Sequence, residues 1–395
     1  MGEAVVRGEL LLLVAALVAI LARRLRLSYT VGLLVAGIAL AFSPIAAGVS
    51  VTKDLIFLVF LPPLVFEAAF LMRWDRLRAN LAPITLMATL GLFVATAVVA
   101  LGLAFLLHWD WRSAALFAAL ISATDPVSVI ALMKERGVEG RLRLLLEGES
   151  LFNDGTAAAL FVVALQVAAG GSLSVAGALQ SFALISIGGI AVGLAVGFAC
   201  VTLMGRAEDH LVEICLSAVA AFGSFLLAER LGLSGVLATL CAGLVIGNYG
   251  PLRGLTAKGR DDAETFWEFA AFVANSLVFL LMGLRLAHAP YHLVWLDGAV
   301  AIGLVLFGRA VAVVGSAALF SRGGHRIGWA DQKVLVWGGL RGALALGLAL
   351  GIPAGLPQRD TVVAVAFVVV GFSIVVQGLT VGPMLRRATV PVEPA

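Results

Sequence analysis

The stretch Ser122-Ala-Thr-Asp-Pro-Val-Ser128 interrupts a long apolar run, and Glu147-Gly-Glu-Ser-Leu-Phe-Asn-Asp-Gly-Thr156 leads directly into the next one. The acidic residues of these two segments and of an apolar run upstream include Asp125, Glu149, Asp154 and Glu67. An ionisable side chain at bilayer depth costs at least ~2.5–3.5 kcal/mol to insert, so it is rarely found there without a partner or a task. The pattern predicts a buried site for a cation, a proton, or both in turn.

Composition places the chain in a membrane. Hydrophobic residues make up 61% of the 395 residues and charged residues 13%, whereas soluble domains are nearer half apolar and a quarter charged. Apolar runs of about 20 residues, long enough to cross ~30 Å of hydrocarbon, follow one another along the sequence. We therefore expect an all-α polytopic membrane protein. No separate soluble domain is expected, because the longest hydrophilic connection, residues 250–264, is too short to fold.

The apolar runs predict about thirteen transmembrane helices within a single membrane domain, which is embedded over residues 9–387. The predicted spans are 9–22, 29–47, 51–72, 81–107, 113–133, 148–169, 178–204, 210–228, 232–249, 265–287, 293–320, 334–352 and 361–384. Lys and Arg concentrate in short cytoplasmic loops. Nineteen of the 27 basic residues fall on the side reached after odd-numbered spans, and six on the other. This asymmetry predicts an N-terminus outside and a C-terminus in the cytoplasm.

Two of these spans are predicted to be broken. Pro126 removes a backbone donor and clashes with the preceding turn, so the helix should open near residues 123–125. Opened backbone at bilayer depth is tolerated where it lines a cavity or is buried in protein, and its carbonyls can ligate a cation. Gly338-Gly-Leu-Arg-Gly342 is the second candidate, seven spans later and therefore opposite in direction. Inverted-repeat transporters pair discontinuous helices in this way. An ordinary proline kink is the alternative for the first break.

The acidic residues are expected to have unequal roles. On a helix, Ser150 and Asp154 share a face one turn apart, while Glu149 points partly elsewhere. A hydroxyl group beside a carboxylate suits a small hard cation, which prefers oxygen ligands. Arg341 lies inside the twelfth span and needs a carboxylate partner. We assign it Glu149, which leaves Asp154 free to titrate.

Three further polar residues lie within the spans. Asn153 can form hydrogen bonds without carrying a charge, and we count it among the candidate ion- and proton-binding residues. Glu67 follows a Pro-Pro pair that is expected to kink the third span, and both ion ligation and structural pairing stay open for it. Arg309 has no assigned partner and is interpreted as a packing or gating residue. The alternative to an ion site is that all these groups form a static, charge-balanced network.

The motifs resemble those of the sodium/proton antiporters of the monovalent cation:proton antiporter superfamily, in particular the bacterial NhaP and eukaryotic NHE branch. The matching segments occur in family order: residues 60–67, 122–127, 147–156, 275–285 and 338–343. The resemblance implies inverted repeats, a six-helix core with two crossed broken helices, and a dimerisation domain. It also implies a homodimer in the plasma (inner) membrane.

By this resemblance, Asp154 binds sodium and protons alternately. The resemblance implies further ligands, direct or through water: Ser150, Thr124, Glu67 and Asp125. The transported substrates would be H⁺ and Na⁺, with Li⁺ or K⁺ as alternatives that the motifs do not separate. No cofactor, enzymatic activity or nucleic-acid partner is implied.

Two further roles follow from the same resemblance. Glu149 and Arg341 match the structural ion pair of the family. Asn153 occupies the place where the electrogenic branch has a second aspartate, which implies electroneutral exchange of one cation for one proton.

Functions from other classes fit the residues less well. A cation channel needs a continuous pore and usually a selectivity filter repeated across subunits, and the sequence offers neither. An intramembrane hydrolase needs a nucleophile and a base, but the spans offer no histidine partner for a serine. A sensor or scaffold would usually carry a soluble output domain. A potassium/proton antiporter on the same fold is the closest alternative.

Overall fold

The computed structural model describes residues 2–25, 28–43, 52–125, 127–135, 137–138, 140–171, 174–207, 209–287, 291–320 and 325–388. Within these ranges the chain is helical, with turns and no strand, as its composition predicts. In chain order the helices are α1 (Gly2–Leu25), α2 (Tyr29–Leu40), η2 (Leu55–Phe60), α3 (Leu61–Leu71), α4 (Trp74–Ala79), α5 (Leu81–Leu86), η3 (Met87–Gly91), α6 (Leu92–Leu106), α7 (Trp111–Ile121), α8 (Val127–Glu135), α9 (Arg141–Ala168), α10 (Val175–Met204), α11 (His210–Arg230), α12 (Gly235–Arg253), α13 (Ala257–Leu286), α14 (Tyr291–Leu319), α15 (Trp329–Gly338), α16 (Ala343–Leu350), α17 (Arg359–Phe372), η4 (Ser373–Gln377) and α18 (Gly378–Ala388).

Apolar helical segments correspond one to one with the thirteen predicted spans over the described residues. Eight are long and apolar enough to cross a membrane: Leu81–Leu106, Arg141–Ala168, Val175–Met204, His210–Arg230, Ala257–Leu286, Val294–Leu319, Trp329–Leu350 and Arg359–Leu385. The shorter ones are Gly8–Ala22, Tyr29–Leu40, Leu55–Leu71, Trp111–Ile121 and Gly235–Gly250. The predicted ends of the second and third spans, at residues 44–51, lie outside the described residues. The polytopic all-α prediction is confirmed.

The connection predicted over residues 250–264 is wrong in extent, because both flanking helices continue into it. Helix α12 ends at Arg253 and α13 already begins at Ala257. The Thr256 hydroxyl caps α13 by accepting a hydrogen bond from the Gly259 amide at 3.0 Å. One turn later, Arg260 and Glu264 form an i,i+4 ion pair at 2.9 Å. Hydropathy marks where a helix leaves the apolar layer, and a capped, charged helix continues beyond that point.

The third span changes helix type just before its proline pair. Residues Leu55–Phe60 form a π-helix, and Pro62 and Pro63 follow in the first turn of α3. Proline is tolerated in the first turn of a helix, where its missing amide has no intrahelical acceptor. The structure shows a change of helix type at this place, and the expected kink stays a prediction. Short π-helical segments also interrupt the fourth span, at Met87–Gly91, and the last, at Ser373–Gln377.

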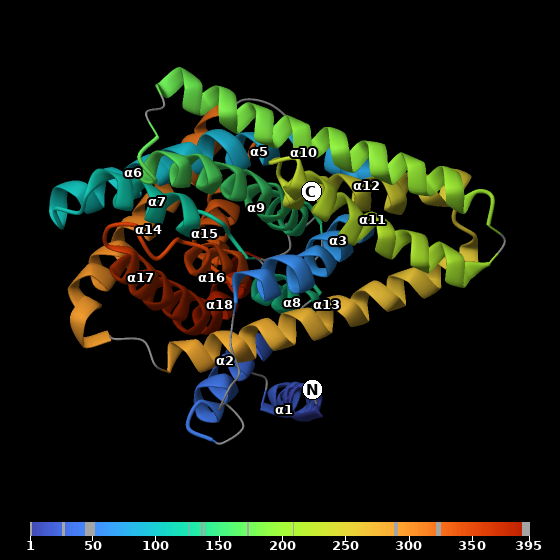
Figure 1. The fold of residues 1–395 in the computed structure, drawn as a ribbon, viewed down its shortest axis with the longest axis horizontal. Coiled ribbons are helices and arrows are strands. Elements are labelled where there is room, and N and C mark those ends of the chain that lie inside the picture. The colour runs from blue at the N-terminus through green and yellow to red at the C-terminus, as the bar shows by residue number, and fades with distance from the viewer. Residues whose placement is uncertain are drawn as a thin grey trace, which may run out of the picture.

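The helices form two packed groups that meet along α9 and η2. One contains α5–α7 and α14–α18, and the other contains α1–α3 and α10–α13. In Figure 1, α6, α7, α14, α16 and α17 gather at the left and α11 and α12 at the right, while α10 and α13 run across the top and bottom. In the group that contains α10–α13 and α1–α3, glycines bring backbones into contact. A Cβ atom on Gly193 of α10 would lie 2.1 Å from the Ala238 carbonyl oxygen of α12. One on Gly283 of α13 would lie 2.3 Å from the Leu34 carbonyl oxygen of α2.

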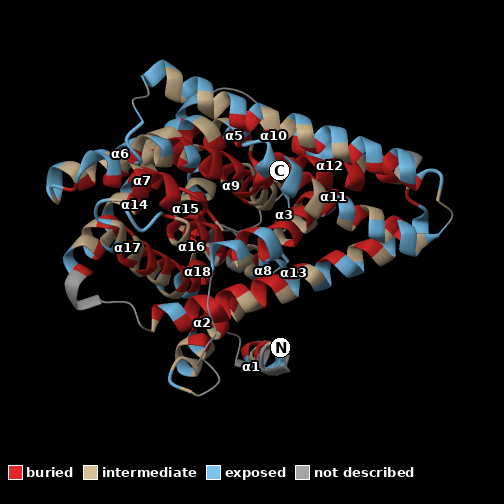
Figure 2. Ribbon diagram, viewed as in Figure 1, coloured by how far each residue is buried: buried red, intermediate tan, exposed pale blue. Residues whose placement is uncertain are grey.

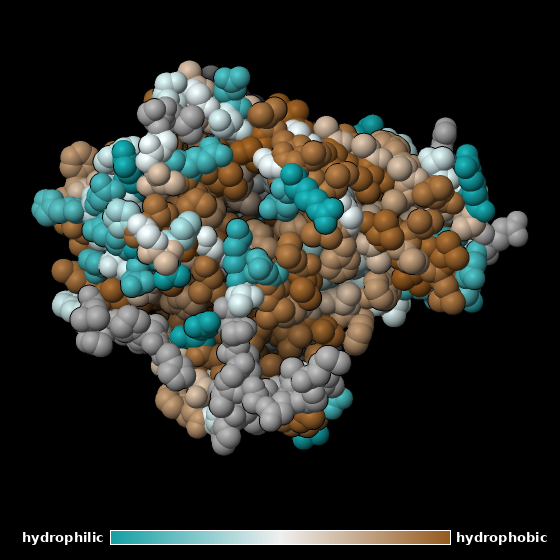
Figure 3. Space-filling view, viewed as in Figure 1, coloured by the Kyte–Doolittle hydropathy of each residue, from teal (hydrophilic) through white to brown (hydrophobic). Residues whose placement is uncertain are grey.

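Burial follows the pattern of a protein surrounded by lipid. Buried residues, red in Figure 2, concentrate where α9 crosses the centre, and they include several polar and charged side chains. Large apolar side chains instead point outward: Leu184 and Ile187 of α10 are 66% and 65% exposed, and Phe105 of α6 is 75% exposed. Figure 3 shows apolar side chains over much of one face. Hydrocarbon solvates such a surface, which leaves the interior free to hold the polar groups.

Candidate functional site

Both predicted helix breaks are present, and they meet. Residues 122–125 are non-helical between α7 and α8, and residues 339–342 are non-helical between α15 and α16; Pro126 lies outside the described residues. The Asp125 amide donates a hydrogen bond to the Leu340 carbonyl at 2.7 Å. The two opened segments therefore touch through their backbones inside the protein, where each satisfies part of the hydrogen-bonding capacity of the other.

Charged side chains of opposite sign lie at the ends of the helices that flank the two breaks. The Arg341 guanidinium donates to the carbonyls of Ser122 and Ala123, at 2.8 and 3.0 Å, where α7 ends. The Asp125 carboxylate accepts a hydrogen bond from the Val127 amide at 3.0 Å, where α8 begins. The same carboxylate lies against Gly342 at the start of α16, where a Cβ atom would fall 2.0 Å from its oxygen. A cation thus faces the negative end of one helix, and an anion faces the positive ends of two.

The predicted ion pair between Glu149 and Arg341 is wrong: the partner of Glu149 is Arg309. Two parallel hydrogen bonds join them, Nη1 to Oε1 at 2.6 Å and Nη2 to Oε2 at 2.8 Å. Arg309 also donates to the Leu335 carbonyl at 3.2 and 3.1 Å, so it connects α14, α9 and α15. Glu149 is fully buried and Arg309 is 5% exposed. Arg341 is already engaged with the carbonyls that end α7, and within the described residues it makes no ion pair with a carboxylate.

Asn153 supports this ion pair. Its amide nitrogen donates to Glu149 Oε1 at 3.0 Å, one helical turn away. Its side-chain oxygen is buried and has no hydrogen-bond partner in the part of the chain that the structure describes. Glu149 therefore accepts three hydrogen bonds, two of them from a cation, and it is permanently neutralised.

Asp154, unlike Glu149, has no cationic partner over the described ranges. It lies one turn beyond Ser150 on α9, and its carboxylate has no hydrogen bond or ion pair over the described ranges. The place where the opened segments 122–125 and 339–342 meet is here called the crossing. Ser150 lies at the crossing, because its hydroxyl is 3.0 Å from the Thr124 hydroxyl in the opened segment. Both hydroxyl groups are buried at 1% exposure, while Asp154 is partly accessible. The arrangement offers hydroxyl oxygens and an uncommitted carboxylate beside the crossing, which are ligands that a small hard cation prefers.

Glu67 is on α3, in the other helix group. It is partly accessible, and in the described chain no hydrogen bond joins it to Asp154, Ser150 or Thr124. Helix α3 does pack against α9, so Glu67 belongs to the boundary between the two groups. The structure therefore brings Thr124 and Ser150 together and leaves Glu67 outside that hydrogen-bonded set.

Sequence reasoning missed a polar chain that holds the second break. The Arg341 amide donates to the Ser373 hydroxyl at 2.8 Å, and that hydroxyl donates to Gln377 Oε1 at 2.6 Å. Gln377 Nε2 in turn donates to the Trp337 carbonyl at 3.0 Å, near the end of α15. Ser373 and Gln377 bound the π-helix of the last span. The available signal was two polar residues four apart in an otherwise apolar run.

Known proteins resemble this chain in sequence and in fold. The family described as sodium/hydrogen exchanger, transmembrane, matches residues 11–387. The chain is 38% identical over 371 residues to the low-affinity Na⁺/H⁺ antiporter NhaS1 of Synechocystis sp., covering 91% of this chain and 69% of that protein. It is 34% identical over 339 residues to the Na⁺/H⁺ antiporter NhaP of Pseudomonas aeruginosa, covering 83% and 80%. Its fold is similar to the sodium proton antiporter MjNhaP1 from Methanocaldococcus jannaschii, with a TM-score of 0.80, 18% identity and 98% of both chains covered.

Proposed function

The chain belongs to the sodium/hydrogen exchanger family and is a secondary active cation:proton antiporter, and we propose that Asp154 is the carboxylate at which cation and proton compete. The transported cation is sodium, as in the names of the relatives. One observation carries the assignment: Asp154 is unpartnered over the described ranges, whereas Glu149 and Asp125 are committed to Arg309 and to helix ends.

The physical reason is the cost of an unpaired charge at bilayer depth. A lone carboxylate there is stable when it carries either a proton or a metal cation. The helices that carry Asp154 can then shift between the two sides only when its charge is compensated. A ligand drives such a shift only through different affinities for the two states. Binding one substrate therefore requires release of the other, which is antiport.

Ser150 and Thr124 are the proposed neutral ligands of the cation. Their hydroxyl groups already lie 3.0 Å apart and one of them is a helical turn from Asp154. Oxygen ligands replace part of the hydration shell without adding charge. Glu67 stays a predicted ligand, direct or through water. Asp125 is better supported as the anion that compensates the starts of α8 and α16.

Electroneutral exchange of one sodium ion for one proton is also proposed. Asn153 stands beside Asp154 and carries no charge, and its amide is engaged with Glu149. One carboxylate without a fixed partner binds either one sodium ion or one proton, so each cycle would exchange one positive charge for another. The proposed setting is the inner membrane, with the N-terminus outside, the C-terminus in the cytoplasm, and two copies forming a homodimer.

The test is proton flux in proteoliposomes that contain the purified protein. Asp154→Asn should abolish sodium-driven alkalinisation, measured with a pH-sensitive dye, while Asp261→Asn, an exposed carboxylate at the start of α13, should leave it unchanged. Full exchange by Asp154→Asn would overturn the assignment. Comparing sodium, lithium and potassium gives the ion preference. A rate that changes when valinomycin and potassium clamp the membrane potential would refute electroneutrality.

A further inference from the structure

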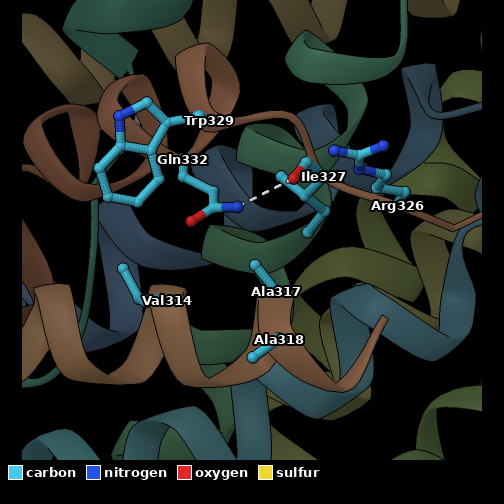
Figure 4. A pocket seen from close by; sticks show the side chains of 7 residues that line it. All are labelled: Val314, Ala317, Ala318, Arg326, Ile327, Trp329 and Gln332. Atoms are coloured by element: carbon cyan, nitrogen blue, oxygen red, sulfur yellow. Dashed lines mark hydrogen bonds between the residues drawn. The ribbon is translucent and has the colours of Figure 1, made fainter. Parts of the chain in front are cut away.

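Two adjoining hollows lie between α14 and α15, on a face that the ion site does not use. The first has a volume of about 340 Å³ and is lined by Val314, Ala317, Ala318, Arg326, Ile327, Trp329 and Gln332. The second, about 250 Å³, shares three of these residues and extends along the helices to Val336, Trp337 and Met384. Figure 4 shows Trp329 and Val314 at one end of the first hollow and Arg326 at the other.

Helical spacing explains why the two hollows form one groove. The residues that α14 contributes follow the spacing i, i+4, i+7, i+8: Ala310, Val314, Ala317 and Ala318. Those of α15 follow the same spacing, with an additional residue at i+3: Trp329, Gln332, Lys333, Val336 and Trp337. Such positions lie on one face of a helix. Small residues on one helix thus face large ones on the other, which leaves an elongated apolar space.

Two exposed basic residues border the groove, Arg326 at the first hollow and Lys333 at the second. Arg326 and Lys333 are both exposed, and the Lys333 ammonium lies 5.7 Å from the centre of the Trp329 ring. Over the described ranges neither basic side chain forms an ion pair. The acid of α15, Asp331, does not line the groove; it interacts instead with Arg141 and the Gly328 amide.

Hydrogen bonds restrain the backbone at residues 325–327, beside the first hollow. Arg141 of α9 donates to the carbonyls of Arg326 and His325, at 2.6 and 2.8 Å. Gln332 donates to the Ile327 carbonyl at 2.9 Å, the bond drawn in Figure 4. These bonds hold the backbone that carries Arg326 beside the groove.

We propose that this groove, here named the α14–α15 groove, binds an anionic phospholipid of the cytoplasmic leaflet. An acyl chain would fill the apolar length, and the two basic residues that border the hollows, Arg326 and Lys333, would attract the phosphate. Basic pockets between transmembrane helices on the cytoplasmic side are suited to anionic headgroups, and tryptophan favours the headgroup level. The side of the membrane follows from the orientation proposed above.

The lipid would contact a helix that leads directly to the ion site. Trp337, at the inner end of the groove, donates its indole N–H to the Thr380 hydroxyl at 2.9 Å. Its carbonyl is held by Gln377, and the opened segment 339–342 begins two residues further on. An anionic lipid in the groove would therefore brace α15 against α14 next to the crossing.

Lipid retention measured by native mass spectrometry tests the proposal. The full-length protein in detergent is mixed with equal amounts of phosphatidylglycerol and phosphatidylcholine of the same chain length. We expect the anionic lipid to be retained at least tenfold more, and the preference to fall in concentrated choline chloride because salt screens exposed charges. The double variant Arg326→Gln/Lys333→Gln should lose the preference. Ala318→Trp, which fills the groove without changing charge, should reduce retention of the anionic lipid.

Arg112→Gln is the matched control. Arg112 also lies beside a tryptophan, 5.4 Å from the ring centre of Trp111, but neither residue lines the α14–α15 groove. This variant should retain the anionic lipid as the unchanged protein does. Equal retention of both lipids by the unchanged protein would overturn the proposal. So would a preference that survives the double variant, or one that Arg112→Gln removes to the same extent.

Discussion

Replacing Arg309 with methionine removes one half of a buried ion pair, and we expect this change to destabilise the fold by about 3–5 kcal/mol. Glu149, which is fully buried, would keep only the hydrogen bond from Asn153. The Leu335 carbonyl would lose its two hydrogen bonds from the guanidinium. A hydrogen bond to a charged group is worth about 1.5–3 kcal/mol, so the two that Glu149 loses account for the expected magnitude.

A double-mutant cycle separates this pair from other consequences of the substitution. The variants are Glu149→Gln, Arg309→Met and both together, with Arg341→Met combined with Glu149→Gln as the matched comparison. Unfolding in mixed micelles, followed by tryptophan fluorescence, gives the free energy of each variant. We expect a coupling energy of about 2–3 kcal/mol between Glu149 and Arg309, and below about 0.5 kcal/mol between Glu149 and Arg341. The opposite order would refute the pairing described above and restore the one that the sequence suggested.

Three further predictions follow from the crossing and its surroundings. Gly342→Ala should prevent assembly of the site, because its Cβ would lie 2.0 Å from an Asp125 oxygen, and sodium-driven proton flux should be lost; Gly303→Ala, where a Cβ meets nothing within 4 Å, should leave flux unchanged. Asn153→Asp should lower the free energy of unfolding by about 1–3 kcal/mol, because Glu149 loses a hydrogen-bond donor and a second negative charge is placed beside it. An unchanged free energy of unfolding would contradict this. Lowering the pH should raise the apparent KM for sodium, by up to about tenfold per unit, without changing the rate at saturating sodium, because protons occupy the same carboxylate; a pH effect that persists at saturation would argue against competition.

Apolar length and helix-breaking residues predicted most of the fold. The number of spans follows from runs long enough to cross hydrocarbon, and both breaks follow from Pro126 and from the glycines around Arg341. Helical spacing also predicted the unequal roles of Glu149 and Ser150. The Glu149 side chain points toward α14, and the Ser150 side chain points toward the opened segment at Thr124.

The partner of Glu149 could not be derived in the same way. Sequence gives the approximate depth of Arg309 and of Arg341, and both lie well within spans. It does not give the rotation of α14 about its axis or the position of α14 beside α9, and these decide which guanidinium reaches the carboxylate. Ser373 and Gln377 escaped notice for a related reason. Two polar residues four apart in an apolar run do not reveal that the helix between them is a π-helix.

The glycine contacts described for α10 and α13 limit where helices can slide. Between α10 and α12, the Cβ position of Gly193 is occupied by the Ala238 backbone, which has no alternative rotamer to adopt. Across the boundary between the groups, the space beside Gly155 of α9 is instead filled by the Leu237 side chain of α12, whose torsions can change. A relative displacement of the two groups therefore meets interdigitated but adjustable side chains at α9, while α10 and α12 stay locked in register. Any movement of the proposed ion site relative to the bilayer would therefore leave α10 and α12 together as one unit and would change the packing of Leu237 against α9.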